Sequence, residues 1–224
     1  MNPIRILITE DEPLFRDMLR TALEKFPELQ VIGSAANGQE AIDAGKQLHP
    51  DVVLMDIELG PGPNGIQAGR EIKKAWPDTG IVLLSMHADR QYLAGFPAEM
   101  AAGWSYLLKQ SVGDLQALVR AIQGSACGFV VVDSAVITGL KPNAESNLAR
   151  LTDRQLEVVQ QMSAGYNNAA IAQNLSISEK SVENYVNSIF HEMGLFADEP
   201  VHRRVKAVLK YLQETNYIQD PPGG

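Results

Sequence analysis

The chain has a single cysteine, Cys127, among its 224 residues. An intramolecular disulfide framework is therefore excluded, and one unpaired thiol fits a reducing compartment. No apolar run approaches the roughly 18 residues that a membrane span requires. The N-terminal segment also turns acidic at Glu10 and Asp11, too early for a signal peptide. These absences predict a soluble, cytoplasmic protein that makes no membrane contact.

Positive charge is scarce as well. The 19 Lys and Arg residues are outnumbered by 27 Asp and Glu residues, which gives a formal net charge of -8. Proteins that bind nucleic acid usually carry a basic patch, so the overall charge gives no support to that class. The hydrophobic fraction of 45% is that of a globular protein, and the length allows one large domain or two small ones.

What is present, in the first part of the chain, is an alternation of strand-like and helix-like segments. The strand-like apolar runs lie at residues 4–9, 30–35, 51–55, 81–85 and 104–109. This order predicts an α/β domain over residues 1–125, with a five-stranded parallel, doubly wound (flavodoxin-like) sheet. The fourth helix, within residues 89–103, contains Gly95 and Pro97, so we expect it to be short or kinked. The helix after the fifth strand is expected to begin at Ser111.

The last part of the chain has a purely helical pattern. Residues 126–147 indicate a linker, residues 148–216 an all-α four-helix domain, and residues 217–224 a tail. Thr152 and Gln155 form a capping-box pattern at the first of the four helices. A short helix is then followed by a longer one that begins at Ser178, which is the helix-turn-helix arrangement.

Polar residues stand at the ends of four of the apolar runs: Glu10 and Asp11, Asp56, Ser85, and Lys109. Because the carboxyl ends of parallel strands meet in one crevice, we expect these side chains to converge. Three carboxylates repel one another, and Mg²⁺ would relieve that repulsion. Asp11 and Asp56 are the expected direct ligands. Glu10 is expected to act through a water molecule, and the backbone carbonyl near Glu58 to supply a further oxygen.

The same crevice suits phosphoryl chemistry. A carboxylate beside Mg²⁺, here Asp56, can act as a nucleophile toward a phosphoryl group. Lys109 would balance the charge on the phosphoryl oxygens, and Ser85 would donate a hydrogen bond to one of them.

With these residues in place, the chain resembles the NarL/FixJ family of response regulators, which join a receiver domain to a LuxR-type helix-turn-helix. The resemblance implies a two-component regulator of transcription rather than an enzyme. It implies that a sensor histidine kinase phosphorylates Asp56, and that Ser85 and Tyr106 act as switch residues. It also implies that the activated protein is a homodimer that binds double-stranded DNA.

The resemblance also implies which residues meet DNA, because the helix from Ser178 enters the major groove in that family. Val182, Val186, Ile189 and Met193 should face the core. The residues left to point outward are Lys180, Ser181, Glu183, Asn184, Asn187 and Ser188. Asn184 and Asn187 can bond adenine edges, and a Glu can accept from cytosine.

The cations of the second domain are the expected phosphate contacts. These are Arg150, Arg154, Lys180, Arg203, Arg204 and Lys206. Family members often carry Lys or Arg where this chain has Glu183, so we expect weak monomer binding that dimerisation strengthens. The start of the last helix, at His202 to Arg204, is the expected dimer contact.

One segment departs from the family pattern. After Asp56 the family has Pro at the fourth position and Gly at the eighth, whereas this chain has Gly60, then Pro61, and Gly65 at the ninth. The loop is therefore one residue longer. It motivates a second hypothesis, an atypical regulator that acts without phosphorylation through constitutive dimerisation or protein contacts. A third hypothesis is a Mg²⁺-dependent phosphohydrolase. Such enzymes usually need an Asp two residues after the nucleophile, where this chain has Glu58.

Overall fold

The computed structural model describes residues 2–87, 102–138, 140–142, 146–196 and 202–217. These divide into two compact units, the first made of residues 2–87 and 102–131, the second of the described residues from 132 onward. Within the described residues, no helix is both long and apolar enough to cross a membrane.

The first unit is built on a parallel sheet. Its strands are β1 (Ile4–Thr9), β2 (Leu29–Ala35), β3 (Val52–Asp56), β4 (Gly80–Ser85), β5 (Trp104–Leu108) and β6 (Val131–Val132), whose last residue is the first of the second unit. Their order across the sheet is β2-β1-β3-β4-β5-β6, and the pairs β1/β2, β1/β3, β3/β4 and β4/β5 are parallel. The carboxyl ends of β1, β3, β4 and β5 therefore lie at one edge, as the sequence predicted.

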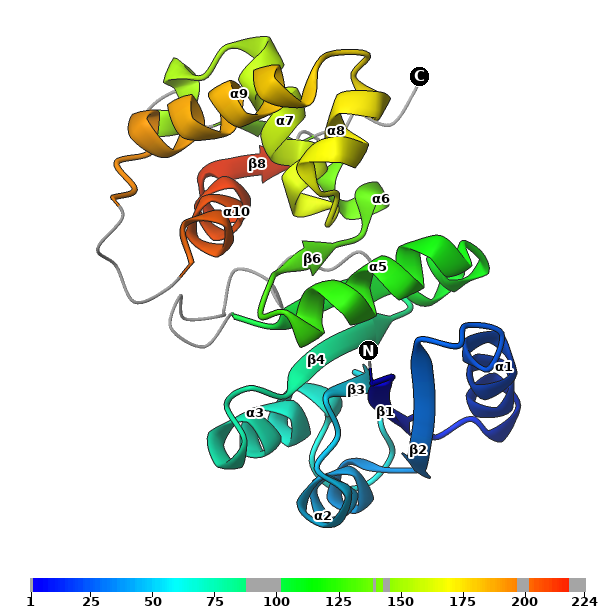
Figure 1. Cartoon of the computed structure of the whole chain (residues 1–224). Helices are drawn as coiled ribbons and strands as arrows, with labels where there is room; N and C mark the ends of the chain where they lie inside the picture. The colour runs from blue at the N-terminus through cyan, green and yellow to red at the C-terminus, as the bar shows by residue number, and fades with distance from the viewer. Residues whose placement is uncertain (1, 88–101, 139, 143–145, 197–201, 218–224) are drawn as a thin grey trace, which may run out of the picture. The chain divides into compact units, whose positions relative to one another are not determined.

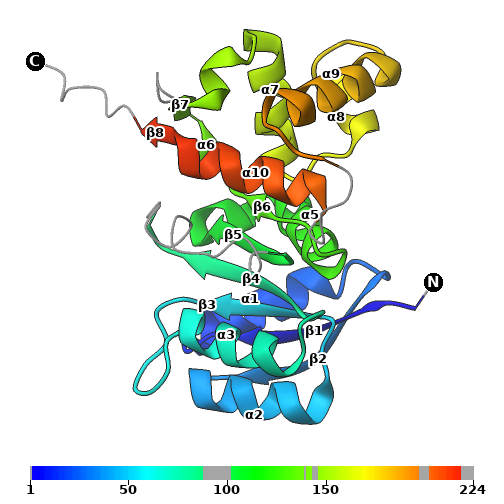
Figure 2. The ribbon, with the colours of Figure 1, turned by 90° about the vertical axis from the view of Figure 1, so that its left-hand side faces the viewer.

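Helices cover both faces of this sheet. α1 (Pro13–Leu23) and α5 (Leu115–Ala126) pack on one face, and α2 (Gly38–Leu48) and α3 (Gly65–Ala75) on the other (Figures 1 and 2). Every residue of β3, β4 and β5 is buried, as expected for strands covered on both sides. The core between the sheet and the α1/α5 layer contains Ile6, Leu54, Leu84 and Leu118.

Polar side chains fix where the helices begin. Asn37 caps α2, and Asn64 forms a capping box with Gln67 at the start of α3. The expectation that the last helix of this unit begins at Ser111 was wrong. Residues Lys109–Gly113 form a short 3₁₀ helix, η1, and α5 begins after Asp114, whose carboxylate accepts from two backbone N–H groups of the first turn. A carboxylate satisfies those otherwise unpaired donors, so it fixes the start of α5 there.

The expectation of five strands was also incomplete. The apolar run at residues 130–132, assigned to the linker, adds β6 as a sixth strand beside β5. A buried hydroxyl supports this edge, because Ser105 Oγ accepts from the backbone N–H of Val131 at 3.2 Å and lies 2.7 Å from Ser125 Oγ. Most of the predicted fourth helix, with Gly95 and Pro97, lies outside the described residues.

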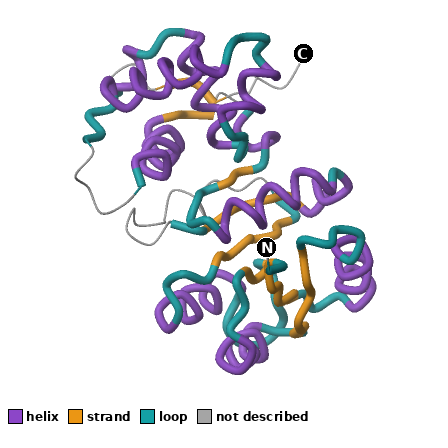
Figure 3. The backbone as a smooth tube through the Cα atoms, viewed as in Figure 1, coloured by secondary structure: helices purple, strands orange, loops and turns teal. Residues whose placement is uncertain are grey.

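The second unit is mainly helical (Figure 3). Its helices are α6 (Ser134–Ile137), η2 (Asn147–Arg150, 3₁₀), α7 (Asp153–Ser163), α8 (Asn168–Asn174), α9 (Glu179–Glu192) and α10 (Arg203–Glu214). The capping box of Thr152 and Gln155 is present at α7. The unit is not purely α, because β7 (Leu140–Pro142) pairs antiparallel with β8 (Thr215–Tyr217). Part of the predicted linker and the residues directly after α10 thus form a small two-stranded sheet, which the sequence pattern did not predict.

Candidate functional site

Three carboxylates converge at the carboxyl edge of the sheet. Glu10 and Asp11 directly follow β1, and Asp56 is the last residue of β3. One oxygen from each lies within 4.8 Å of the others. Glu10 and Asp56 are buried and Asp11 is exposed. Clustered carboxylate oxygens open to solvent on one side are the ligands that Mg²⁺ takes, with water completing its shell. The donor set therefore fits a hard divalent cation.

Lys109 bridges two of these carboxylates. It follows β5 directly, and its Nζ lies 3.0 Å from Glu10 Oε1, 2.8 Å from Glu10 Oε2 and 3.0 Å from Asp56 Oδ2. The Lys109 side chain is 12% exposed, against 0% and 3% for its two partners. These three groups form one buried ionic cluster, in which the ammonium offsets the negative charge of two carboxylates that have little contact with bulk water.

The pKa values of the cluster follow from burial and charge. Burial, with the nearby charge of Asp56, raises the pKa of Glu10, while the hydrogen bond from Lys109 opposes the rise. Burial, with the charge of Asp11, likewise raises the pKa of Asp56. Burial alone would lower the pKa of Lys109, but its hydrogen bonds to Glu10 and Asp56 raise that pKa above the usual value. Lys109 is therefore held in its charged form.

Backbone and helix contacts orient the carboxylates. The N–H of Glu12 donates to Glu10 Oε1 at 3.2 Å, and the N–H of Glu58 donates to Asp56 Oδ1 at 3.2 Å. Arg16, in the first turns of α1, donates to the backbone carbonyl of Glu10. Asp56 thus has Lys109 on one oxygen and the loop backbone on the other.

Ser85 and Tyr106 meet at one backbone group. The Ser85 hydroxyl donates to the carbonyl of His87 at 3.0 Å and accepts from the His87 N–H at 3.2 Å. The hydroxyl of Tyr106, a fully buried side chain, donates to the same carbonyl at 2.5 Å. Both residues therefore hold the start of the segment that follows β4.

The longer loop after Asp56 closes back on the strand that precedes it. The Gly65 N–H donates to the Ile57 carbonyl at 3.0 Å, and a Cβ at Gly65 would lie 1.9 Å from the Asp56 carbonyl oxygen. At the other side of the loop, a Cβ at Gly38 would lie 2.0 Å from the Pro63 carbonyl oxygen. Only glycine allows these approaches. The loop is one residue longer than in the family pattern, and close backbone contacts at Gly65 and Pro63 fix its position.

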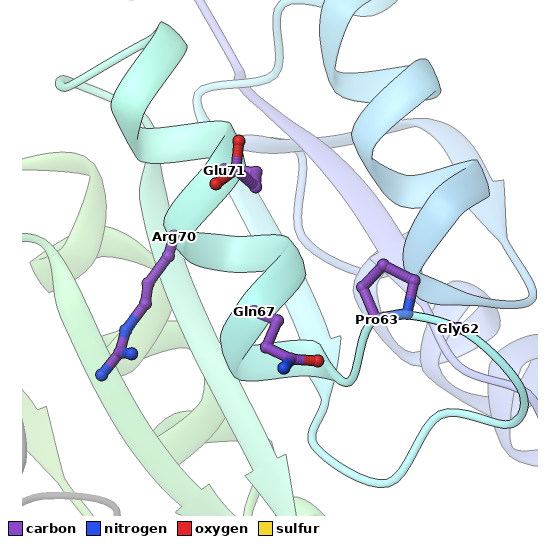
Figure 4. A pocket seen from close by; sticks show the side chains of 5 residues that line it. All are labelled: Gly62, Pro63, Gln67, Arg70 and Glu71. Carbon is purple, nitrogen blue, oxygen red and sulfur yellow. The ribbon is translucent and has the colours of Figure 1, made fainter.

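A shallow hollow of about 490 Å³ lies beside this loop, lined by Gly62, Pro63, Gln67, Arg70 and Glu71. Figure 4 shows Arg70 and Glu71 extending in different directions from α3, away from Pro63. Their polar groups do not converge on a common point. The hollow offers no chemistry comparable to that of the acidic cluster.

In the second unit, α9 separates a buried face from an exposed one. Val182, Val186, Ile189 and Met193 are buried, as expected. The exposed stripe contains Lys180, Asn184 and Asn187, with Glu183 partly exposed beside them. Lys180 Nζ and Glu183 Oε2 form an ion pair at 2.9 Å on this surface.

Two of the predicted DNA contacts have partners inside the unit. Ser181 bonds the capping residue Ser178, with their hydroxyl oxygens 2.8 Å apart. Ser188 Oγ accepts from Gln155 Nε2 at 2.8 Å, which ties α9 to α7. Ser188 therefore points toward α7, contrary to the outward orientation that we expected for it.

Several of the expected phosphate contacts are also engaged within the unit. Arg154 donates to the Leu175 carbonyl at 2.6 Å and pairs with Glu157. Arg203 lies over the Phe190 ring, 5.0 Å from its centroid.

Arg204 is engaged more deeply, on α10. Its guanidinium donates to the Tyr166 carbonyl and to Asn168 Oδ1, and burial lowers its pKa to about 10. Arg204 therefore positions the start of α8 rather than a surface contact.

Each of the two units matches a known protein family. Residues 6–123 match the model described as "Response regulator receiver domain", and residues 149–210 match "Bacterial regulatory proteins, luxR family". The chain is a response regulator. It belongs to the two-component regulators that carry a LuxR-type DNA-binding domain.

Similar proteins cover nearly the whole response regulator. It is 32% identical to the transcriptional regulatory protein DegU of Brevibacillus brevis, over 95% of this chain and 94% of that protein. It is also 32% identical to the transcriptional regulatory protein LnrK of Bacillus subtilis (strain 168), over 86% and 91% respectively. These relatives are regulators of transcription, not enzymes. The solved structure of the Salmonella typhimurium RcsB response regulator has the same fold, with a TM-score of 0.50, 22% identity and coverage of 95% and 98%.

The response regulator's acidic site also contains residues that the sequence did not single out. Phe15 lies under the Lys109 ammonium, with Nζ 5.0 Å from the ring centroid, and Arg16 holds the Glu10 backbone. Both lie in the helix that follows the acidic pair, where a helical pattern assigns apolar residues to the core. His87 acts through its backbone carbonyl, which no side-chain pattern can reveal.

Proposed function

We propose that this response regulator is switched by phosphorylation of Asp56, with a sensor histidine kinase as the phosphoryl donor. The observation that carries the proposal is the placement of Asp56. Its carboxylate lies beside two further carboxylates and 3.0 Å from Lys109, at the end of a buried strand. A structural ion pair would not need three clustered carboxylates, two of them with raised pKa values.

Asp11 and Asp56 are proposed to hold Mg²⁺ directly, with Glu10 acting through water. The carbonyl near Glu58 is proposed as a further ligand. When bound, the cation would neutralise charge on the carboxylates and on the oxygens of the phosphoryl group. Asp11, the exposed member of the cluster, lies where the ion can enter.

Asp56 and Lys109 have different roles in the proposed phosphoryl transfer. A carboxylate oxygen of Asp56 attacks phosphorus, the bond from phosphorus to the kinase histidine nitrogen breaks, and the electron pair stays on that nitrogen. Lys109 opposes the rise that burial causes in the pKa of Asp56 and so favours the ionised form of the nucleophile. Its ammonium is already in position to contact the oxygens of the incoming group.

The switch is proposed to run through Ser85 and Tyr106. The Ser85 hydroxyl, which donates to the His87 carbonyl in this structure, would donate instead to a phosphoryl oxygen on Asp56. The His87 carbonyl would then lose the Ser85 donor and keep that of Tyr106. The segment after β4 is thereby linked to the state of Asp56.

The output is proposed to be DNA binding by a homodimer in the cytoplasm. The exposed stripe of α9 would enter the major groove, where Asn184 and Asn187 can bond adenine edges and Glu183 can accept from cytosine. Two copies bound to a two-fold site double the phosphate contacts available to an acidic chain. Ser181 remains a proposed contact, although its hydroxyl bonds that of Ser178, whereas the Ser188 hydroxyl is directed toward α7.

Acetyl phosphate with Mg²⁺ tests the phosphoacceptor. We expect intact-protein mass spectrometry to show one phosphoryl group on the wild type and on Asp43→Asn, an exposed carboxylate of α2, and none on Asp56→Asn. Equal modification of the wild type and Asp56→Asn would contradict the assignment. A wild type that takes no phosphoryl group and binds no Mg²⁺ would favour the alternative regulator that acts without phosphorylation.

A further inference from the structure

The environment of Lys109 contains one contact that the acidic cluster does not explain. Its ammonium lies 5.0 Å from the centroid of the Phe15 ring, and the Lys109 side chain is only 12% exposed. Glu10 and Asp56 take two of the three directions in which the ammonium can donate. An aromatic ring has a negative face that attracts a cation, most strongly where water is excluded.

The ring is itself fixed in place. Phe15 lies in α1 and packs against the core cluster between the sheet and α1/α5. The next residue, Arg16, donates to the Glu10 backbone carbonyl. Adjacent residues of one helix thus reach two members of the site, one through the cation and one through the backbone that carries a carboxylate.

We propose that Phe15 is a positioning residue that holds the Lys109 ammonium at the Asp56 carboxylate. A lysine side chain has many rotamers, and ordering it costs conformational entropy. The ring and the two carboxylates together confine the ammonium before a phosphoryl group arrives. Part of that entropy is then lost during folding rather than during transfer, which speeds the transfer step. This consequence rests on the proposed phosphorylation of Asp56; the contact between ring and ammonium does not.

The proposal makes the electron density of the ring, not its shape, the property that matters. Replacing Phe15 in the full chain by 3,4,5-trifluorophenylalanine keeps the ring nearly unchanged in size but removes most of its attraction for a cation. We expect phosphorylation by acetyl phosphate at saturating Mg²⁺ to slow by about threefold to tenfold. Phe15→Tyr should retain most of the rate, and Phe15→Leu, which has no ring to attract the cation, should slow it at least as much as fluorination does.

A double-mutant cycle with Lys109→Met separates positioning from packing. Fluorination should lower the midpoint of Mg²⁺-free urea unfolding in the Lys109 background and leave it unchanged in the Lys109→Met background. Lys109→Arg keeps a cation and should keep the sensitivity, whereas Lys109→Gln, which also lacks the cation, replaces Lys109→Met as the comparison if that variant does not fold. An equal effect of fluorination with and without the cation, or no effect in the native background, would overturn the proposal.

The two readouts separate this proposal from the proposed function. If the wild type takes no phosphoryl group, the phosphoacceptor assignment fails, and the unfolding cycle still decides whether the ring holds the ammonium. If phosphorylation proceeds and every fluorinated variant matches its parent, the assignment stands and the role of Phe15 is refuted.

Discussion

Replacing Lys109 by Met should destabilise the first unit strongly in the absence of divalent cations. Methionine keeps most of the apolar length of the lysine but removes the ammonium that lies within 3.0 Å of both Glu10 and Asp56. The two buried carboxylates are then left facing each other without a counter-charge. Breaking a buried ion pair by removing one partner costs about 3–5 kcal/mol. Because Lys109 is 12% exposed, we expect the lower end of that range, about 3 kcal/mol.

The pH dependence of this loss has a definite sign. The pKa values of Glu10 and Asp56 are already raised by burial, and removal of Lys109 raises them further. A carboxyl whose folded pKa lies above its unfolded value loses stability as the pH rises toward the folded pKa. The deficit of Lys109→Met should therefore be greatest near about pH 7 and shrink toward about pH 3, where both groups are protonated in the folded chain and largely protonated in the unfolded chain.

Tryptophan fluorescence can measure the stability that Lys109→Met loses. Its two tryptophans, Trp76 and Trp104, both lie in the first unit, so urea unfolding followed by tryptophan fluorescence reports on that unit alone. Lys74→Met, at an exposed position of α3, is the matched control and should change stability by less than about 0.5 kcal/mol. Equal stability of the two variants, or a Lys109→Met deficit that does not change with pH, would refute the reasoning.

Three further predictions concern the loop and the second unit. Gly65→Ala places a Cβ against the Asp56 carbonyl and should cost about 3 kcal/mol, whereas Gly60→Ala, with nothing within 4 Å, should cost less than about 0.5 kcal/mol in the same urea assay. Glu183→Lys should steepen the salt dependence of DNA binding by about one unit of slope per subunit, and an unchanged slope in fluorescence anisotropy would remove α9 from the phosphate contacts. Arg204→Met should destabilise the second unit by about 1–3 kcal/mol, because the Tyr166 carbonyl loses its buried donor; an unchanged melting curve by circular dichroism would contradict that.

The parallel sheet and the convergence of its polar strand ends followed from the sequence because each depends on a strong local signal. Continuous apolar runs such as Val52–Met55 mark strands covered on both faces, and each was followed directly by the polar residue of interest. Parallel topology then places those residues together without further information.

The features that the sequence did not predict depend on tertiary contacts. The strand β6 has two residues, too few for any periodic signal, and exists because Ser105 and Val131 meet across the sheet. The start of α5 was set by the carboxylate of Asp114 rather than by Ser111. The sequence suggested that Arg204 is a surface cation. In the structure its guanidinium donates to the Tyr166 carbonyl and to Asn168 Oδ1.

The central claim is that a phosphoryl group on Asp56 controls DNA binding. The most direct test adds beryllofluoride with Mg²⁺ to the full chain and measures its oligomeric state and its affinity for a two-fold DNA site. We predict that the wild type shifts from monomer toward dimer and binds that DNA more tightly, while Asp56→Asn responds in neither measurement. A wild type and an Asp56→Asn variant that dimerise and bind DNA alike, with or without beryllofluoride, would contradict it.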